Sequence, residues 1–313
     1  MKAHEKITLS LAGSGNVGSF LAGELFKAGV QIKQIFSRTL ANAQALANKV
    51  DAEAIDSIES IDTDVDLLII ALPDHVIPEF SKVLASRLSG NSEFFGHSGK
   101  SESSSNSAFD HSDNSESSDS TESFHHTDNS ETVNKTKLLV ASTSGSVHIN
   151  EISRYFSKCG VLYPLQSFTL KTNPDPHTVP FCIEATDVET AGLLKHLASM
   201  ISKDVRDVDS NQRILIHMAA VFASNFTNHM MAIAEDVIDK AEQNFDILRP
   251  LINETVERLA KFSPSEVQTG PAVRNDKETL DKHIELLGSI AKKEFSEIYS
   301  LISESILKKK NKT

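Results

Sequence analysis

The fold is decided by a stretch near the start of the chain, Ile7-Thr8-Leu9-Ser10-Leu11-Ala12-Gly13-Ser14-Gly15-Asn16-Val17-Gly18. Its first half predicts a short buried strand, and its second half is a G-x-G-x-x-G turn leading into a helix expected over residues 19–27. In such a turn the first glycine permits a tight bend, the second lets the backbone approach a pyrophosphate, and the third lets the helix pack close to the strand. The N–H groups at the helix start then face the phosphates. The stretch predicts a dinucleotide site formed by Gly13, Ser14, Gly15, Asn16, Val17 and Gly18; the alternative is a turn with only a structural role.

The residues after the second expected strand, residues 31–36, bear on the choice of coenzyme. An NAD-specific site places an Asp or Glu about twenty residues past the glycine motif, where it holds the ribose 2′-hydroxyl. This chain has Ser37, Arg38 and Thr39 there. A guanidinium with two hydroxyls suits a 2′-phosphate, because Arg binds such a group through two parallel hydrogen bonds. The sequence therefore favours NADP (NADPH) over NAD, and the alternative is a solvated arginine at a helix start.

Expected strands and helices alternate through the first half of the chain, which predicts an α/β fold with a Rossmann-like, doubly wound parallel sheet. Further strands are expected over residues 66–72, 137–141, 160–163 and 180–185, and helices over residues 40–49, 76–88, 147–158 and 188–201. Residues 66–72 form a continuous apolar run, which is typical of a strand covered on both faces.

Loops at the carboxyl ends of the strands contact the cofactor in a sheet of this kind. Leu72 and Pro73 end one such strand, and Ser144 lies in the hydroxyl- and glycine-rich turn after another, residues 142–146. All three are therefore predicted to bind the cofactor, with Ser144 near its nicotinamide half. Asp74 is expected to cap the helix that follows it.

Residues 89–136 differ from their surroundings, being dominated by Ser, Asp, Glu, Asn and His without periodicity. Nine acidic residues outweigh Lys100, Lys135 and the adjacent Lys137. Such a segment cannot bury enough apolar surface to offset its ordering entropy, so we expect a disordered insert between two sheet strands. Its histidines lack metal-site spacing. A regulated interaction tail is a further interpretation of the same residues.

Composition excludes several classes of function. The formal net charge of −12 argues against a nucleic-acid partner. Cys159 and Cys182 have neither C-x-x-C nor metal-ligand spacing, so they are expected to be core residues in a reducing compartment, and no metal site is predicted. The first strand begins within a few residues of the N-terminus, and no apolar run has the length of a membrane span, so we expect a cytoplasmic protein with no membrane partner.

The second half of the chain is expected to be helical. Asp209 and Gln212 form a capping pair for a long helix over residues 210–242, which is apolar on every side and is therefore expected to be buried. His217, Ser224 and Asn228 are seven and four residues apart on this helix, which places them on one face, with Asn225 to one side. Buried polar groups need partners, so this row either faces a ligand or forms an internal hydrogen-bond network.

Two further features follow that helix. Pro250 is expected to open a helix, and residues 268–276 form a polar, glycine-containing segment between helices, where Thr269 and Arg274 could close a site. Asp276 is expected to cap the next helix. Because one small bundle offers little to cover a long buried helix, we predict a homodimer joined through the helical halves.

Several of these segments together resemble the family of Rossmann-like plus DUF2520 proteins. They are the glycine motif, Ser37-Arg38, and residues 143–146, 162–168, 217–226, 250–255 and 268–276. The resemblance implies an NADP-binding domain over residues 1–185, similar to the N-terminal domains of F420-dependent NADP reductases and pyrroline-5-carboxylate reductases. It also implies an all-α domain over residues 186–313, of the 6-phosphogluconate-dehydrogenase-like kind, for substrate and dimerisation. The family often has His-Thr-Ser-Gly where this chain has Ser142-Thr143-Ser144-Gly145, so a role for that histidine does not carry over.

The expected function is an NADP-dependent oxidoreductase that transfers a hydride to or from a small C=O or C=N carbon. His217 is the expected proton donor or acceptor, because imidazole titrates near neutrality. Asn225 and Asn228 would orient the substrate, which Ser224, Thr269 and Arg274 would help to bind. The alternative is a non-catalytic NADP-binding sensor or interaction protein, because a glycine motif reports binding and not turnover.

Overall fold

The computed structural model describes residues 6–90, 138–169, 174–290 and 293–311. The chain divides into two compact units, Met1–Met218 and Ala219–Thr313. This division lies farther along the chain than residue 185, because the last helix and strand of the α/β region pack with the sheet. The insert expected over residues 89–136 falls almost wholly outside the described residues.

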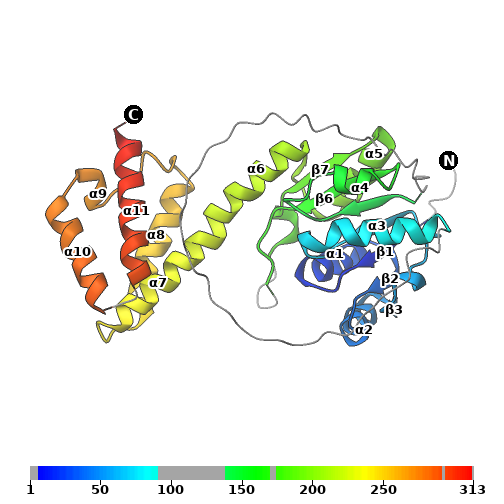
Figure 1. Cartoon of the computed structure of the whole chain (residues 1–313), viewed down its shortest axis with the longest axis horizontal. Helices are drawn as coiled ribbons and strands as arrows, with labels where there is room; N and C mark the ends of the chain where they lie inside the picture. Colours follow the sequence, from blue (N-terminus) through cyan, green and yellow to red (C-terminus); the bar gives the residue numbers. More distant parts are fainter. Residues whose placement is uncertain (1–5, 91–137, 170–173, 291–292, 312–313) are drawn as a thin grey trace, which may run out of the picture. The chain divides into compact units, whose positions relative to one another are not determined.

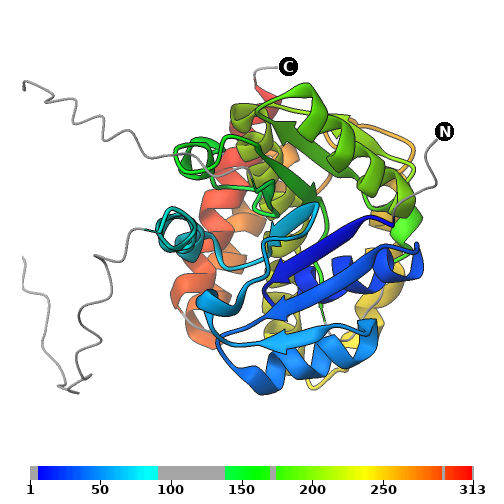
Figure 2. The ribbon, with the colours of Figure 1, turned by 90° about the vertical axis from the view of Figure 1, so that its right-hand side faces the viewer.

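The first unit is built on one eight-stranded sheet with the order β3-β2-β1-β4-β5-β6-β7-β8 (Figures 1 and 2). Its strands are β1 (Thr8–Ala12), β2 (Gln31–Phe36), β3 (Glu53–Ile55), β4 (Leu67–Ile70), β5 (Val140–Ser142), β6 (Cys159–Pro164), β7 (Phe181–Ala185) and β8 (Val205–Asp207). All neighbouring strands are parallel except β6 and β7, which are antiparallel. The expected doubly wound α/β fold is confirmed.

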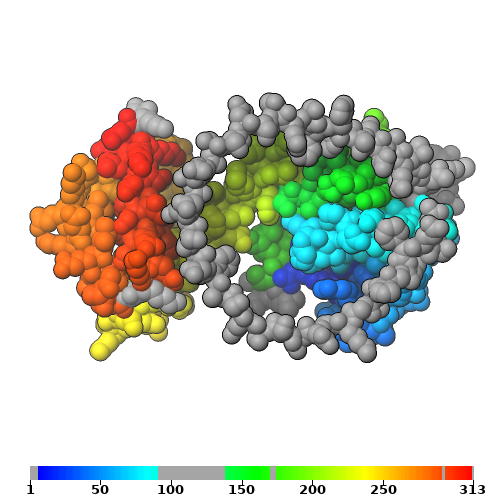
Figure 3. All heavy atoms as spheres, viewed as in Figure 1, coloured from blue at the N-terminus to red at the C-terminus, as the bar shows by residue number. Residues whose placement is uncertain are grey.

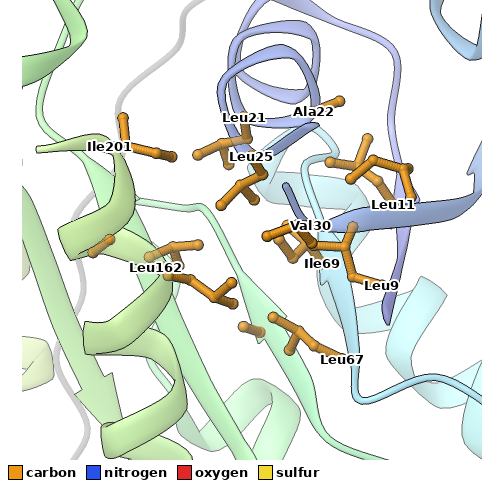
Figure 4. Close-up of a cluster of buried hydrophobic side chains, with 14 of the residues drawn as sticks. Leu9, Leu11, Leu21, Ala22, Leu25, Val30, Leu67, Ile69, Leu162 and Ile201 are labelled. Carbon is orange, nitrogen blue, oxygen red and sulfur yellow. The ribbon is translucent and has the colours of Figure 1, made fainter. Parts of the chain in front are cut away.

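Helices cover both faces of this sheet because alternate strand residues are apolar on both sides. One face packs against α1 (Asn16–Lys27), α2 (Leu40–Val50) and α5 (Val188–Ile201), and Leu9, Leu11 and Ile69 belong to this core (Figure 4). The other face packs against α3 (Ile77–Leu88) and α4 (Asn150–Ser153), with Leu68 and Ile70 in that core. In the space-filling view α3, in cyan, lies as a continuous layer on the first unit (Figure 3).

Two strands and one helix differ from expectation. β3 and β8 were not expected; both are three residues long and contain exposed charged side chains, as edge strands commonly do. The helix expected over residues 147–158 is reduced to α4. Residues 144–147 before it form a tight turn held by the Ser144 hydroxyl.

The long helix expected over residues 210–242 consists of three consecutive parts. They are α6 (Ser210–Ala220), the π-helical turn η5 (Val221–Phe226) and α7 (Thr227–Asp239). The capping pair is confirmed, since Asp209 Oδ1 accepts from the Gln212 N–H at 2.8 Å and Gln212 Oε1 accepts from the Asp209 N–H at 2.9 Å. The expectation that the helix is buried is wrong for the single chain: Leu215 and Phe222 are 59% and 64% exposed.

The second unit continues from Ala219 as a helical region. After α7 come α8 (Arg249–Leu259), α9 (Pro271–Arg274), α10 (Lys277–Ile290) and α11 (Lys293–Lys310), and α10 and α11 lie side by side (Figures 1 and 3). Pro250 lies in the first turn of α8, and Asp276 caps α10 by accepting from the Thr279 N–H at 3.2 Å, as expected. Among the described residues, no helix has both the length and the hydropathy that crossing a bilayer requires.

Candidate functional site

The glycine turn after β1 contains two glycines that the fold itself requires. Gly13 has a φ of 121°, and a Cβ built on it would lie 2.2 Å from the Ala71 carbonyl oxygen. A Cβ on Gly18 would lie 2.1 Å from the carbonyl oxygen of Gly13. These contacts set α1 directly against the turn, so both positions are explained by packing within the chain.

Gly15 lacks any such explanation from within the chain. Its φ is −72°, which every residue adopts, and a Cβ built on it would meet no atom of the described residues within 4 Å. Gly15 is the N-cap of α1, and no side chain caps this helix end. The open space therefore lies beside the first N–H groups of a twelve-residue helix, where an anionic group is bound favourably.

A cavity of about 340 Å³ lies beside this turn in the first unit. Seven of the predicted cofactor residues line it: Gly13, Ser14, Gly15, Ser37, Arg38, Leu72 and Pro73. Phe36, Ile58, Val76 and Phe80 add apolar walls. A cavity that joins a helix start, a guanidinium and an apolar slot fits a nucleotide, which has phosphates and a flat base.

Arg38 follows the end of β2 by two residues, and its side chain is exposed. Within the described part of the chain no carboxylate forms an ion pair with its guanidinium. Thr39 is the N-cap of α2 without a side-chain capping bond, and Ser37 donates its N–H to the Ile55 carbonyl oxygen at 3.1 Å. The cation beside the cavity is thus available to an anionic ligand.

Asn16 holds a neighbouring loop with its side chain. Its amide donates to the Phe168 carbonyl oxygen at 2.9 Å, and the rings of Phe20 and Phe168 lie 4.4 Å apart. The segment after β6 is therefore attached to the start of α1. The backbone N–H groups of Asn16 and Val17 still lie at the helix start, where phosphates are expected.

A second polar cluster lies where β5 and β6 end, next to α6. The Tyr163 hydroxyl and His217 Nδ1 are 3.0 Å apart, and their rings meet edge to face. A Cβ on Gly145 would lie 2.6 Å from His217 Nδ1 and 2.8 Å from Tyr163 Cζ. The turn after β5 therefore packs directly on this pair. Burial, and to a lesser extent the Cys182 thiol and the Asp74 carboxylate, raise the pKa of Tyr163 to about 12.

Asp74 corrects one expectation from the sequence. The N-cap of α3 is Val76, with no side-chain capping bond. The Asp74 carboxylate instead accepts a hydrogen bond from the Ser146 hydroxyl. This hydrogen bond joins the loop after β4 to the loop after β5.

Two residues of this cluster were missed in the sequence. Tyr163 is the last residue but one of β6, and Leu72 and Ser144 each follow the end of a strand by two residues. This shared position at the strand ends was the available signal. Arg213 is completely buried on α6, where it pairs with Glu184 at 2.9 Å and donates to the Ser144 and Val147 carbonyl oxygens at 2.9 and 2.8 Å. One basic residue at the start of an apolar helix was its only signal.

The remaining predicted residues belong to the second unit. Ser224, Asn225 and Asn228 are exposed, and the first two lie in the π turn η5. The expected alignment at steps of seven and four assumed an unbroken α-helix, and η5 does not keep that period. Thr269 lines an apolar cavity of about 560 Å³ among α7, α10 and α11, and Arg274 is exposed at the end of α9.

Comparisons with known proteins agree with this architecture. Residues 8–92 match the family described as NADP oxidoreductase, coenzyme F420-dependent, and residues 179–306 match the domain of unknown function DUF2520. No curated protein matches the chain significantly.

Among solved structures, a protein of Bacteroides fragilis provisionally named an NADP oxidoreductase is 31% identical, with a TM-score of 0.75 over 97% of this chain and 98% of that one. A reductive aminase of Aspergillus terreus in complex with NADPH4, cyclohexanone and allyl amine is 12% identical, with a TM-score of 0.61 over 97% and 95%. A pyrroline-5-carboxylate reductase of Coxiella burnetii is 14% identical, with a TM-score of 0.51 over 98% of both chains. The chain belongs to the family of proteins that join an N-terminal NADP oxidoreductase domain of the F420-dependent type to a C-terminal DUF2520 domain.

Proposed function

We propose that this protein is an NADP-dependent oxidoreductase that transfers a hydride to or from a small C=O or C=N carbon. The observation that carries the proposal is the single cavity lined by seven of the residues predicted to bind the cofactor. The family supports the oxidoreductase class. A neighbour named as a reductive aminase and another named as a pyrroline-5-carboxylate reductase support C=N compounds among the substrates.

Different residues around the cavity would bind different parts of the coenzyme. The N–H groups at the start of α1 would bind the pyrophosphate, and the open side of Gly15 gives it room. The guanidinium of Arg38 would bind the 2′-phosphate, with Ser37 and Thr39 beside it. Leu72, Pro73 and Ser144 would contact the part of the coenzyme nearer the nicotinamide. When bound, NADPH supplies the hydride.

His217 is the residue proposed to exchange a proton with the substrate. A phenol whose pKa is about 12 keeps its proton at neutral pH, so the Tyr163 hydroxyl can donate to His217 Nδ1. A neutral imidazole that accepts at Nδ1 carries its proton on Nε2. Tyr163 would thereby orient the ring, since its hydroxyl can donate to Nδ1 of the neutral imidazole or accept from Nδ1–H of the protonated one. The neutral form would take a proton at the nitrogen that carries none, and the protonated form would give the proton on Nε2 to the substrate. Asn225 and Asn228 would orient the substrate, and Ser224, Thr269 and Arg274 would contribute to its binding.

A homodimer joined through the helical halves belongs to the same proposal. Among the described residues, ten of the fifteen large hydrophobic side chains that are exposed belong to the second unit, which is less than half the size of the first. Exposed apolar surface of this density is typical of an interface between protein chains. A second copy of the chain would cover it.

The role of Gly15 is tested by Gly15→Ala. Because its φ suits alanine and none of the described residues has an atom near the added methyl group, the variant should unfold at the wild-type temperature. Its affinity for NADPH should fall about tenfold or more, because the methyl group occupies the space that charge-assisted phosphate hydrogen bonds require. Gly13→Ala is the matched control: its positive φ and the Ala71 carbonyl oxygen should make it unfold at a lower temperature. Wild-type coenzyme affinity in Gly15→Ala, measured by NADPH fluorescence titration, would contradict the assignment.

Coenzyme preference depends on Arg38. Replacing it by alanine should raise the Kd for NADPH about tenfold to a hundredfold, because charge-assisted hydrogen bonds contribute about that much to affinity. The Kd for NADH should stay within about twofold, because NADH has no 2′-phosphate. Calorimetric titration with both coenzymes measures this difference. Arg206→Ala removes another exposed arginine, one that pairs with Asp204, and should change neither Kd. An equal loss for both coenzymes in Arg38→Ala would show that Arg38 does not read the 2′-phosphate.

Catalysis is tested by NADPH oxidation over a panel of keto acids, ketones and cyclic imines. For a substrate that reacts, His217→Ala should lower kcat about a hundredfold to ten-thousandfold, because a positioned proton donor contributes that much, and NADPH affinity should stay unchanged. Tyr163→Phe, which keeps the ring and removes the hydroxyl, should lower kcat by a smaller factor. An unchanged rate in His217→Ala would refute its role. Tight NADPH binding without turnover across the panel would favour the non-catalytic sensor.

The oligomeric state is tested by sedimentation velocity at micromolar concentration. The wild type should sediment as two chains, because burial of the exposed apolar side chains stabilises association. Leu251, 58% exposed on α8, is a suitable position for Leu251→Glu, which should shift the equilibrium toward the monomer with little change in the unfolding temperature. A monomeric wild type would contradict the proposal.

A further inference from the structure

Arg213 is the largest completely buried charged side chain of the described residues. Its Nη1 donates to the Ser144 carbonyl oxygen at 2.9 Å, and its Nη2 donates to the Val147 carbonyl oxygen at 2.8 Å. Nη2 also reaches Glu184 Oε2 at 2.9 Å and Ser210 Oγ at 3.2 Å. One guanidinium thus joins the turn after β5, the end of β7 and the start of α6.

The turn from Ser144 to Val147 is held at both ends by this side chain. Inside the turn, Ser144 Oγ accepts from the N–H groups of Ser146 and Val147 at 3.1 and 2.9 Å. Gly145, between the two held carbonyl groups, is the residue that packs on His217 and Tyr163. The position of the turn relative to α6 is therefore set by Arg213.

His217 follows Arg213 by four residues on the same helix, so the two side chains lie one above the other on one face. The distance between Gly145 and the imidazole is short enough that a single added methyl group would overlap Nδ1. A displacement of the turn by a few tenths of an ångström would therefore act directly on the Tyr163–His217 hydrogen bond.

Stability alone is a weak reason for a charge at this place. Burying an ion pair costs desolvation energy, and apolar side chains of similar volume are often as stabilising. What apolar side chains cannot do is bind two carbonyl oxygens and a carboxylate at once. The guanidinium does this from two separate nitrogens, Nη1 and Nη2, whereas lysine has a single ammonium nitrogen.

We propose that Arg213 is a positioning residue: by fixing the Ser144–Val147 turn against α6, it sets the hydrogen bond between Tyr163 and His217. The inference rests on the proposed function, in which His217 exchanges a proton with the substrate. Glu184, whose side chain is 12% exposed, supplies the counter-charge that keeps the guanidinium in place.

The test is Arg213→Lys in the full-length chain, followed by NMR of the ¹⁵N-labelled histidine side chains. The two ring nitrogens of a neutral imidazole differ in ¹⁵N shift according to which of them carries the proton. We expect Arg213→Lys to change the ratio of the two His217 tautomers and to lower kcat about tenfold or more for any substrate found. The Kd for NADPH should rise by no more than a few-fold, because Arg213 does not line the cavity proposed for the phosphates and acts on the coenzyme only through the Ser144 turn.

Two further variants keep the test decisive if Arg213→Lys does not fold. Glu184→Gln keeps the hydrogen-bond acceptor and removes the counter-charge, and Gly145→Ala displaces the turn directly; both should reproduce the changed His217 signals. Ser202→Ala is the matched control, because it removes a buried hydrogen bond to the Val179 carbonyl oxygen elsewhere in the unit. It should lower the unfolding temperature without changing those signals.

The outcomes separate this inference from the proposed function. Wild-type His217 signals in the folded variants, with only a lower unfolding temperature, would overturn the positioning role. If the variants change the His217 signals but the wild type turns over none of the tested compounds, the structural coupling is supported and the oxidoreductase proposal is refuted instead.

Discussion

The close approach of the β1–α1 turn to the next strand of the sheet is the constraint on which the rest of the first unit depends. The Ala71 N–H donates to the Ala12 carbonyl oxygen at 2.7 Å, and the Gly13 N–H donates to the Phe36 carbonyl oxygen at 2.8 Å. The turn is thus bonded to both neighbouring strands at once. Since no side chain fits between Gly13 and Ala71, α1 begins at the centre of the carboxyl edge of the sheet, with its N–H groups directed at the cavity.

The same edge brings the second cluster together. The loops after β4, β5 and β6 follow adjacent strands, so their residues meet although they are distant in sequence. The hydrogen bond from Ser146 to Asp74 joins two of these loops, and Tyr163 lies on β6 just before the third begins. The cavity beside Gly15 and the Tyr163–His217 pair are therefore two products of one sheet topology.

The elements that the sequence predicted best were those with strong periodicity and clear ends. The bounds of β2 and α5 agree with expectation, because β2 alternates apolar and polar residues and α5 is capped by Asp187, which accepts from the Thr190 N–H at 2.9 Å. The close packing at Gly13 and Gly18 was predictable because the glycine motif acts through local backbone geometry.

What could not be predicted depends on contacts between distant segments. Nothing local marks β3 and β8 as strands, since each is stabilised by pairing with a neighbour already in the sheet. The pairing of Tyr163 with His217 joins residues 54 apart, and Arg213 reaches Ser144 over 69 residues. The assumption that an apolar helix is buried failed for the single chain, in which Leu215 and Phe222 remain exposed.

The π turn η5 has a consequence for relating this chain to its structural neighbours. A π turn closes its hydrogen bonds one residue later than an α turn, which is the mark that a single inserted residue leaves in a helix. A relative whose helix lacks that residue corresponds to this chain only when a one-residue gap is placed within Val221–Phe226. Without the gap, Asn225 and Asn228 would be equated with positions one step away, about 100° around the helix axis.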